Sequence, residues 1–203
     1  AHTSVAGRKP TTLWDRLLDL EYHQKRVSKR SLRYRLGRRS REVREAIEQH
    51  APGPVHRILD IGTADGLMLK SLAQNMDFQM SVGIDHSQEL LIADPHRTFL
   101  PVLADASSLP FKAGTFDVVT ATAVIEHIKN LEEFFAECHR VLREGGILIF
   151  TTSQPFYVRI YTWFSAFERE TSHDLINLEC VFPRCRMANQ HLVGRRRWVV
   201  QTQ

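Results

Sequence analysis

The sequence predicts a doubly wound α/β fold, in which helices cover both faces of a mostly parallel β-sheet. Apolar runs of strand length alternate with segments of helical periodicity, as in successive βαβ units. A run that suits a buried strand, ILDI at residues 58–61, leads directly into a glycine-bearing turn and a helix. The chain has 203 residues, of which 43% are hydrophobic and 25% charged, and these values suit one soluble α/β domain.

Helical periodicity marks the residues that precede the first strand. Apolar side chains recur at helical spacing over residues 11–22, where Thr12 is the expected N-cap. One or two further helices, joined near Gly37 and Ser40, are expected to follow. The segment APGP at residues 51–54 then ends this helical part and begins the first strand.

Charge divides the chain into two parts. Residues 1–50 hold 13 Lys and Arg against 6 Asp and Glu, whereas the remaining residues hold 14 against 17. The basic character of the protein therefore belongs to its N-terminal part. We predict a basic helical cap over residues 1–54 and an α/β domain over residues 55–203, packed together as a single compact unit.

Five strands and three helices are expected to alternate through the α/β part. The expected strands are residues 58–61, 80–85, 100–104, 116–121 and 147–152. The expected helices are residues 66–75, a short one that Ser87 caps, and residues 131–142. Pro101 has no backbone N–H to donate, so its strand is predicted to lie at an edge of the sheet. Gly145 and Gly146 are expected to stop the last helix before the final strand.

The last fifty residues have a less regular pattern. An aromatic-rich segment at residues 156–170 is expected to be helical. Two short strands at residues 175–182 and 198–202 are expected to form an antiparallel pair. The three cysteines are neither closely paired nor spaced as zinc ligands, so we expect no disulfide framework and no zinc site.

The turn after the first strand has the pattern of a ligand-binding loop. Asp60, Gly62, Ala64 and Gly66 follow one another at intervals of two residues. The dinucleotide fingerprint is not met, because Leu67 stands where its third glycine or alanine belongs. The pattern present resembles the first motif of class I S-adenosylmethionine-dependent methyltransferases of the type 11 kind, with Ala64 in place of the middle glycine. The alternative is a tight turn that binds no ligand.

Later segments extend this resemblance over residues 55–153. Asp85 ends the second strand, where an acidic residue of the family binds the ribose of the cofactor. Asp105 and Ala106 follow the third strand, where the family places groups that meet the adenine. Residues 120–128, TATAVIEHI, resemble the segment that lies beside the methionine part of the cofactor and the acceptor cleft.

The resemblance implies that S-adenosyl-L-methionine is the cofactor. Alternatives remain for single residues, since Asp85 could instead stabilise a helix N-terminus and Asp105 could belong to a plain surface turn. The residues expected to bind the cofactor are Asp60, Gly62, Thr63, Ala64, Gly66, Asp85, His86, Asp105, Ala106, Thr120 and Ala121.

Glu126 and His127 match a Glu-His pair that is frequent in the family. His127 is a candidate general base, because an unperturbed imidazole titrates near neutral pH. The alternative is a histidine that only packs its helix. A quinone-pathway subgroup has an additional glutamate that assists a metal, and this chain has Ala123 at that position. We therefore predict no metal site.

The expected activity is methyl transfer to a small molecule, achieved mainly by alignment of the acceptor beside the cofactor. Aromatic side chains near the C-terminus favour a flat or apolar acceptor, and the N-terminal arginines favour an anionic group on it. Because no signal peptide or membrane-length apolar run is present, we expect a cytoplasmic protein.

Other interpretations of the same features stay open. The N-terminal arginines could bind RNA, as in an RNA methyltransferase, could lie on an anionic membrane, or could form a solvated helix face. The chain could also be a catalytically idle cofactor-binding module that acts through its basic arm. A nucleotide-linked oxidoreductase is disfavoured by the spacing of the glycine-bearing turn.

Overall fold

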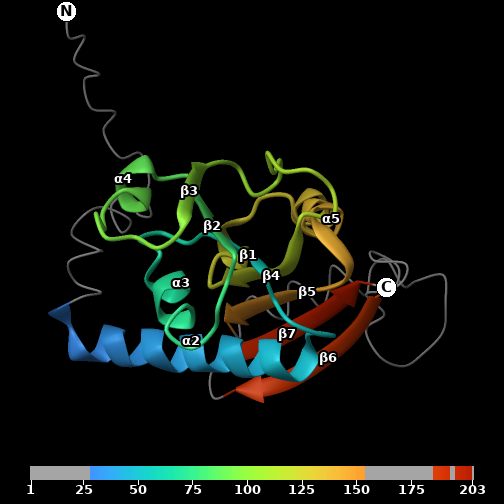
Figure 1. Ribbon diagram of the computed structural model, residues 1–203, viewed down its shortest axis with the longest axis horizontal. Helices are drawn as coiled ribbons and strands as arrows, with labels where there is room; N and C mark the ends of the chain where they lie inside the picture. The colour runs from blue at the N-terminus through green and yellow to red at the C-terminus, as the bar shows by residue number, and fades with distance from the viewer. Residues whose placement is uncertain (1–27, 154–184, 193–194, 203) are drawn as a thin grey trace, which may run out of the picture.

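The computed structural model describes residues 28–153, 185–192 and 195–202. Over this part of the chain one sheet forms the middle layer, with the strand order β3-β2-β1-β4-β5-β7-β6 (Figure 1). The strands are β1 (Arg57–Ile61), β2 (Met80–Asp85), β3 (Leu100–Leu103), β4 (Phe116–Thr122), β5 (Leu142–Ser153), β6 (Cys185–Leu192) and β7 (Arg195–Thr202).

The first five strands are parallel, and β7 runs antiparallel to both of its neighbours, β5 and β6. The chain builds outward from β1 through β2 to β3, then returns to the other side of β1 with β4. Strand order therefore reverses between β1 and β4, which is where doubly wound sheets bind ligands. The predicted Rossmann-like α/β fold is confirmed for these five parallel strands. Pro101 lies in the edge strand β3, as predicted.

Helices pack on both faces of the sheet. They are α2 (Arg30–His50), α3 (Leu67–Leu72), α4 (Gln88–Leu91), the 3-10 helix η1 (Ile125–His127) and α5 (Leu131–Val141). Ser87 caps α4 as predicted, because its hydroxyl accepts the backbone N–H of Leu90 at 3.4 Å. Asn130 caps α5 through its side-chain oxygen, which accepts the N–H groups of Glu132 and Glu133.

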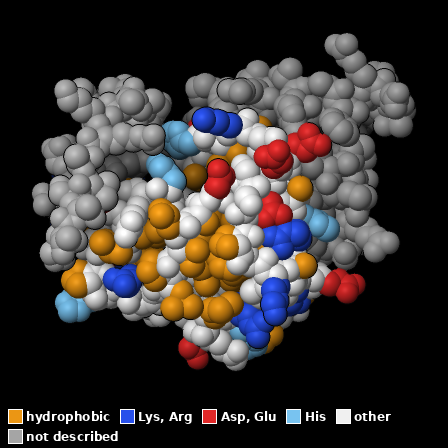
Figure 2. Space-filling model, turned by 90° about the horizontal axis from the view of Figure 1, so that it is seen from above, with side chains coloured by type: hydrophobic (Ala, Val, Ile, Leu, Met, Phe, Trp, Pro, Cys, Tyr) orange, Lys and Arg blue, Asp and Glu red, His pale blue; other side chains and the backbone are white. Residues whose placement is uncertain are grey.

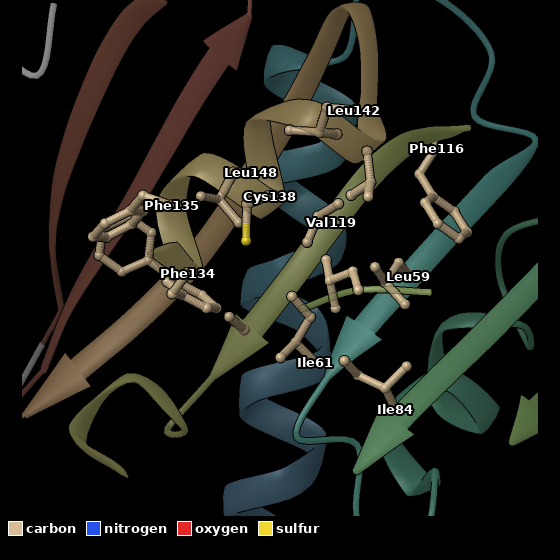
Figure 3. Packing of buried hydrophobic residues seen from close by; sticks show 14 of the residues in the cluster. Leu59, Ile61, Ile84, Phe116, Val119, Phe134, Phe135, Cys138, Leu142 and Leu148 are labelled. Carbon is tan, nitrogen blue, oxygen red and sulfur yellow. The ribbon is translucent and has the colours of Figure 1, made fainter. Parts of the chain in front are cut away.

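The α5 face of the sheet holds the larger apolar cluster. Leu59 and Ile61 of β1 point to this face and share the cluster with Phe134, Phe135 and Cys138 of α5 (Figure 3). The rings of Phe134 and Phe135 meet edge to face, with their centroids 5.1 Å apart. Burial raises the pKa of the Cys138 thiol, so this cysteine is an unreactive core residue.

Helices α2 and α3 cover the opposite face. Ile58, which alternates with its neighbours along β1, joins Val43 and Ile47 of α2 and Leu69 of α3 in a second buried cluster. Since successive residues of a strand point to opposite faces, β1 supplies side chains to both clusters. This double burial explains why its sequence reads as a nearly continuous apolar run.

Helix α2 continues without interruption through Gly37, where the sequence allowed one helix or two. Its C-terminal half is part of the core, and its buried residues begin at Ser40. In the view of Figure 1 the N-terminal end of α2 lies beyond the arrowhead of β5, whereas Leu36 already packs against the core. Division of the chain at residue 54 stays a prediction.

The glycine pair after α5 does not have the predicted role. Helix α5 ends at Val141, and Leu142 already begins β5 by pairing with Phe116 of β4. Gly145 and Gly146 therefore lie inside the extended segment, next to an irregularity in the pairing of β4 and β5. The prediction was wrong because long-range pairing with β4, which no local pattern reveals, begins the strand four residues earlier than Gly146.

Several predicted boundaries also moved. The helix expected at residues 66–75 is shorter, since α3 ends at Leu72 and two turn hydrogen bonds to its carbonyl group follow. Strand β7 contains the strand expected at residues 198–202. Its partner β6 was not predicted. The elements expected at residues 11–22, 156–170 and 175–182 lie outside the described residues.

No helix in the described part of the chain is both long enough and apolar enough to cross a lipid bilayer.

Candidate functional site

The loop between β1 and α3 is fastened to the neighbouring strand by its backbone. The N–H groups of Gly62 and Thr63 both donate to the carbonyl oxygen of Ile84, at 2.9 and 3.0 Å. The N–H of Gly66 donates to the carbonyl of Thr63 at 3.0 Å and closes the turn. The loop therefore lies at the carboxyl ends of β1 and β2, beside the reversal in strand order.

The two predicted loop glycines occupy positions that exclude larger residues. Gly62 and Gly66 have φ angles of 70° and 71°, in the left-handed region that favours glycine. A β-carbon on Gly62 would lie 2.5 Å from a methyl group of Val124, which follows β4. A β-carbon on Gly66 would overlap the ring of Phe99. Close packing against these two side chains explains both glycines.

Ala64 takes the left-handed conformation as well, with a φ of 53°. This conformation costs an L-residue roughly 1–2 kcal/mol. The N–H of Ala64 donates to Oδ2 of Asp85 at 2.9 Å, and both groups are buried. That charge-assisted bond holds the alanine in place.

Asp85 ends β2 and ties two loops together. Its second oxygen, Oδ1, accepts the N–H of Ser87 at 2.9 Å, and only 7% of the residue is exposed. Each carboxylate oxygen can accept a further hydrogen bond, so Asp85 keeps capacity for two hydroxyl groups. His86 is exposed, with Nδ1 3.3 Å from Asp85 Oδ1.

Asp60 and Thr120 join the central strands below the loop. The hydroxyl of Thr120 donates to Oδ1 of Asp60 at 2.6 Å, and both residues are buried. The neighbouring Ala121 side chain belongs to the core on the α5 face. These three residues therefore support the site from within the sheet.

Asp105 begins a turn at the end of β3. Its Oδ1 accepts the N–H of Ser107 at 2.8 Å, and its carbonyl accepts the N–H of Ser108 at 3.1 Å. Asp105 is exposed, whereas Ala106 packs against the α5-side core. The N–H of Ala104 donates to the carbonyl of Asp85 at 3.3 Å, so this turn adjoins the end of β2.

The family described as "Methyltransferase domain" matches residues 59–150. The chain contains a class I S-adenosylmethionine-dependent methyltransferase domain. S-adenosyl-L-methionine is the cofactor of this family.

Two curated relatives share this domain. Ubiquinone biosynthesis O-methyltransferase, mitochondrial, of Rattus norvegicus is 37% identical over 116 residues, which are 51% of this chain and 33% of the rat protein. The tRNA (carboxymethyluridine(34)-5-O)-methyltransferase alkbh8 of Xenopus tropicalis is 39% identical over 92 residues, 44% of this chain and 14% of that protein. The chain thus matches a third or less of the length of these two relatives.

The fold of the methyltransferase domain also resembles solved structures. A crystal structure from Methanococcus maripaludis has a TM-score of 0.64 and 16% identity, and the match covers 100% of this chain and 97% of that one. At so low an identity, the likeness supports the fold alone.

The methyltransferase loop has one buried polar atom that suits a bound cofactor. Thr63 is buried, and its hydroxyl oxygen has no hydrogen-bond partner among the described residues. A buried hydroxyl without a partner is costly, so a polar ligand group at this loop would satisfy it. Together with the remaining capacity of Asp85, this atom shows that the loop fits a polar adenosyl ligand.

The predicted catalytic pair of the methyltransferase domain lies at the same edge of the sheet. Glu126 and His127 belong to η1, directly after β4, where Glu126 is half-buried and His127 exposed. Ala123, just before them, has a φ of 57°, and its N–H donates to the hydroxyl of Thr151 at 3.0 Å. Strain of this kind is often found at functional sites.

Three residues of this site were not predicted. A β-carbon on Gly83 of β2 would lie 2.6 Å from the Thr63 methyl group and 2.8 Å from the Phe99 ring. An isolated glycine within a strand signals close backbone approach, so Gly83 could have been found. Phe99 and Thr151 act through partners distant in sequence, and no local pattern marks them.

Among the described residues, no group of three or more His, Cys, Asp or Glu side chains is arranged to hold a metal. The absence of a metal from the reaction stays a prediction.

Proposed function

We propose that this chain transfers a methyl group from S-adenosyl-L-methionine to a small-molecule acceptor. The observation that carries the proposal is the buried Asp85 carboxylate, which holds Ala64 of the loop and keeps capacity for two hydroxyl donors. A ribose above the loop would supply those donors. Thr63, Gly62 and Gly66 would hold the rest of the cofactor close to the backbone of the loop.

Alignment is the main contribution that the protein would make. The cofactor supplies a methyl group already activated by its sulfonium. Positioning two reactants can contribute about 7–11 kcal/mol, whereas a general base typically contributes about a hundred- to ten-thousandfold in rate. In our proposal, Glu126 and His127 border the acceptor, and His127 accepts a proton from acceptors that need to lose one.

An apolar acceptor with an anionic group agrees best with the surface. Figure 2 shows apolar side chains gathered on the face that is seen from above. Among the described residues, Ile92 and two residues of the edge strand β3, Leu100 and Leu103, are large apolar residues that are more than half exposed. The N-terminal part of α2 supplies exposed arginines that suit a carboxylate or phosphate. The rat relative is named as a ubiquinone biosynthesis O-methyltransferase, which supports a small-molecule acceptor.

Two measurements test the proposal in order. Calorimetry should detect binding of S-adenosylhomocysteine to the wild-type chain, and absence of binding would overturn the proposal. Incubation of a metabolite extract with the chain and methyl-labelled cofactor should then label a small organic compound. Cofactor binding without any labelled product would instead support a catalytically idle module that acts through the basic N-terminal part.

RNA methylation is the second candidate, and the exposed arginines of α2 favour it. Between Arg30 and Arg41 the helix has no acidic residue, and Tyr34 between two arginines is 73% exposed. The frog relative is named as a tRNA methyltransferase. Arginines along a helix suit phosphates, and an exposed aromatic ring suits a stacked base.

Salt dependence separates this candidate from the first. If RNA is the acceptor, affinity for a labelled single-stranded RNA should fall steeply between about 50 and 200 mM salt. Replacing Arg30 and Arg33 by Gln should weaken RNA binding relative to the wild-type chain at the same salt concentration. Arg44→Gln is the control, since Arg44 is already paired with Glu48 at 3.0 Å. A weak affinity for RNA that changes neither with salt concentration nor with these substitutions would reject the RNA candidate.

A cytoplasmic location and the N-terminal cap stay predictions. We also propose that the pair β6 and β7 completes the sheet of the methyltransferase domain beyond the five parallel strands.

A further inference from the structure

We propose that Glu137 and Arg140 of α5 are positioning residues for the adenine end of the cofactor site. They act by holding the segment that follows Asp105, the residue expected to meet the adenine amino group. The inference rests on the proposed function, because an adenosyl cofactor must bind for this positioning to matter.

Both backbone polar groups of one residue, Leu109, are held by this pair. The N–H of Leu109 donates to Oε2 of Glu137 at 2.7 Å, and the carbonyl of Leu109 accepts from Nη2 of Arg140 at 2.9 Å. Nη1 of Arg140 also donates to the carbonyl of Phe111 at 2.7 Å. Two side chains from one helix thereby fix three backbone groups of a loop some thirty residues earlier in the sequence.

The pair itself is joined by two parallel hydrogen bonds. Nε of Arg140 lies 2.6 Å from Oε1 of Glu137, and Nη2 lies 2.7 Å from Oε2. The hydrogen bond from Arg140 holds the pKa of the Glu137 carboxyl below its ordinary value, and the carboxylate raises the pKa of Arg140. A planar guanidinium can serve the carboxylate and two carbonyls together, which a lysine ammonium cannot do with the same geometry.

The held segment begins directly after the Asp105 turn. Residues Asp105 and Ser108 are bridged to each other, and Leu109 is the next residue and is buried. On its other side, the turn is fastened to β2 by the bond from Ala104 to Asp85. The exposed Asp105 side chain is held within its turn by the N–H of Ser107, which donates to Oδ1 at 2.8 Å, so the position of the carboxylate depends on the two anchors that hold the turn.

A purely structural role would stabilise the fold without affecting which base is recognised. The ion pair of Arg143 and Asp117 provides the matched comparison, because it also joins an arginine to a buried carboxylate. That carboxylate accepts the N–H groups of His56 and Arg57, which lie at the start of β1. Arg143 is therefore an ion-paired arginine whose carboxylate partner holds the chain where β1 begins, and not the segment after Asp105.

The experiment measures base discrimination by calorimetry with S-adenosylhomocysteine and its inosine counterpart, in which a carbonyl replaces the adenine amino group. The wild-type chain should prefer the adenine compound, since Asp105 can accept from an amino group but not from a carbonyl. Arg140→Met should bind S-adenosylhomocysteine at least tenfold more weakly and lose most of this preference. Arg140→Lys should not restore it.

The comparison variant decides between positioning and stability. Arg143→Met should lower the melting temperature yet keep the wild-type preference for adenine. If Arg140→Met fails to fold, Glu137→Gln, which conserves side-chain volume, should show the same reduced preference. A folded Arg140→Met or Glu137→Gln variant with wild-type discrimination would overturn the inference. Failure of the wild-type chain to bind either compound would overturn the proposed function as well, and so is distinguishable.

Discussion

The carboxylate of Asp85 accepts the backbone N–H of Ala64 at 2.9 Å, which joins the end of β2 to the left-handed turn after β1. One buried acid thus shapes the loop and supplies the acceptor oxygens expected to face a ribose. Both roles depend on the same negative charge, so a single substitution should remove them together.

Asp85→Ala should weaken S-adenosylhomocysteine binding strongly. Hydrogen bonds to charged groups contribute about 1.5–3 kcal/mol, which corresponds to roughly a ten- to hundredfold rise in Kd. Calorimetry measures this change directly. Asp77→Ala, at an exposed position just before β2, should leave the Kd unchanged. Equal affinities for both variants would contradict the assignment of Asp85.

Ala64→Gly should stabilise the fold although it removes a methyl group. Removing the strain of the left-handed conformation at residue 64 should stabilise the folded state by roughly 1–2 kcal/mol. The greater conformational entropy of glycine in the unfolded chain should offset about 0.5–1 kcal/mol of this gain. We expect the free energy of unfolding to rise by up to about 1 kcal/mol in urea titrations. Ala73→Gly, at a φ of −63°, should lower it instead. Losses of similar size in both variants would show that Ala64 carries no strain.

Gly83→Ala should destabilise the protein by about 1–3 kcal/mol, the usual cost of overpacking. The new methyl group would press on the Thr63 methyl and the Phe99 ring. Adding Thr63→Ser to this variant should recover part of the loss, since it removes one of the two contacts. Gly37→Ala, in the open middle of α2, should be neutral or stabilising. Thermal unfolding of the three variants and the wild type tests the order.

Asp117 should make stability depend on acid pH. Burial raises its pKa, but hydrogen bonds from Arg143 and from the N–H groups of Arg57 and His56 outweigh burial and lower the pKa overall. A lowered folded-state pKa gives stability that is present above the unfolded value of about 4 and is lost as the pH falls through the folded value. The difference in unfolding free energy between wild type and Asp117→Asn should therefore shrink below about pH 4. A difference that is constant with pH would mean that another group dominates.

Local patterns were sufficient for the central part of the fold. The strand expected from Ile58 to Ile61 lies within β1, Ser87 caps α4, and Pro101 lies in an edge strand, because each of these depends on residues near in sequence. The helix stop expected at Gly145 failed because Leu142 pairs with Phe116, a contact that periodicity does not encode.

The candidate site likewise contains residues that the sequence predicts and residues that it does not. Spacing and resemblance singled out Gly62, Asp85 and Thr120, and the structure brings these residues to the carboxyl ends of adjacent strands. Their roles toward a cofactor stay predictions. Thr151 and Phe99 could not be predicted, because their contacts form only in the folded protein. Thr151 of β5 binds the turn after β4, and Phe99, just before β3, packs against the turn after β1.

Continuity of α2 through Gly37 has a consequence for any acceptor that its arginines hold. A flexible arm raises the effective concentration of a bound molecule over a wide range of distances. A rigid helix instead acts as a fixed spacer, and ten helical residues measure about 15 Å. The length of an acceptor, from its anionic group to its reacting atom, then becomes a criterion of selection beside its charge.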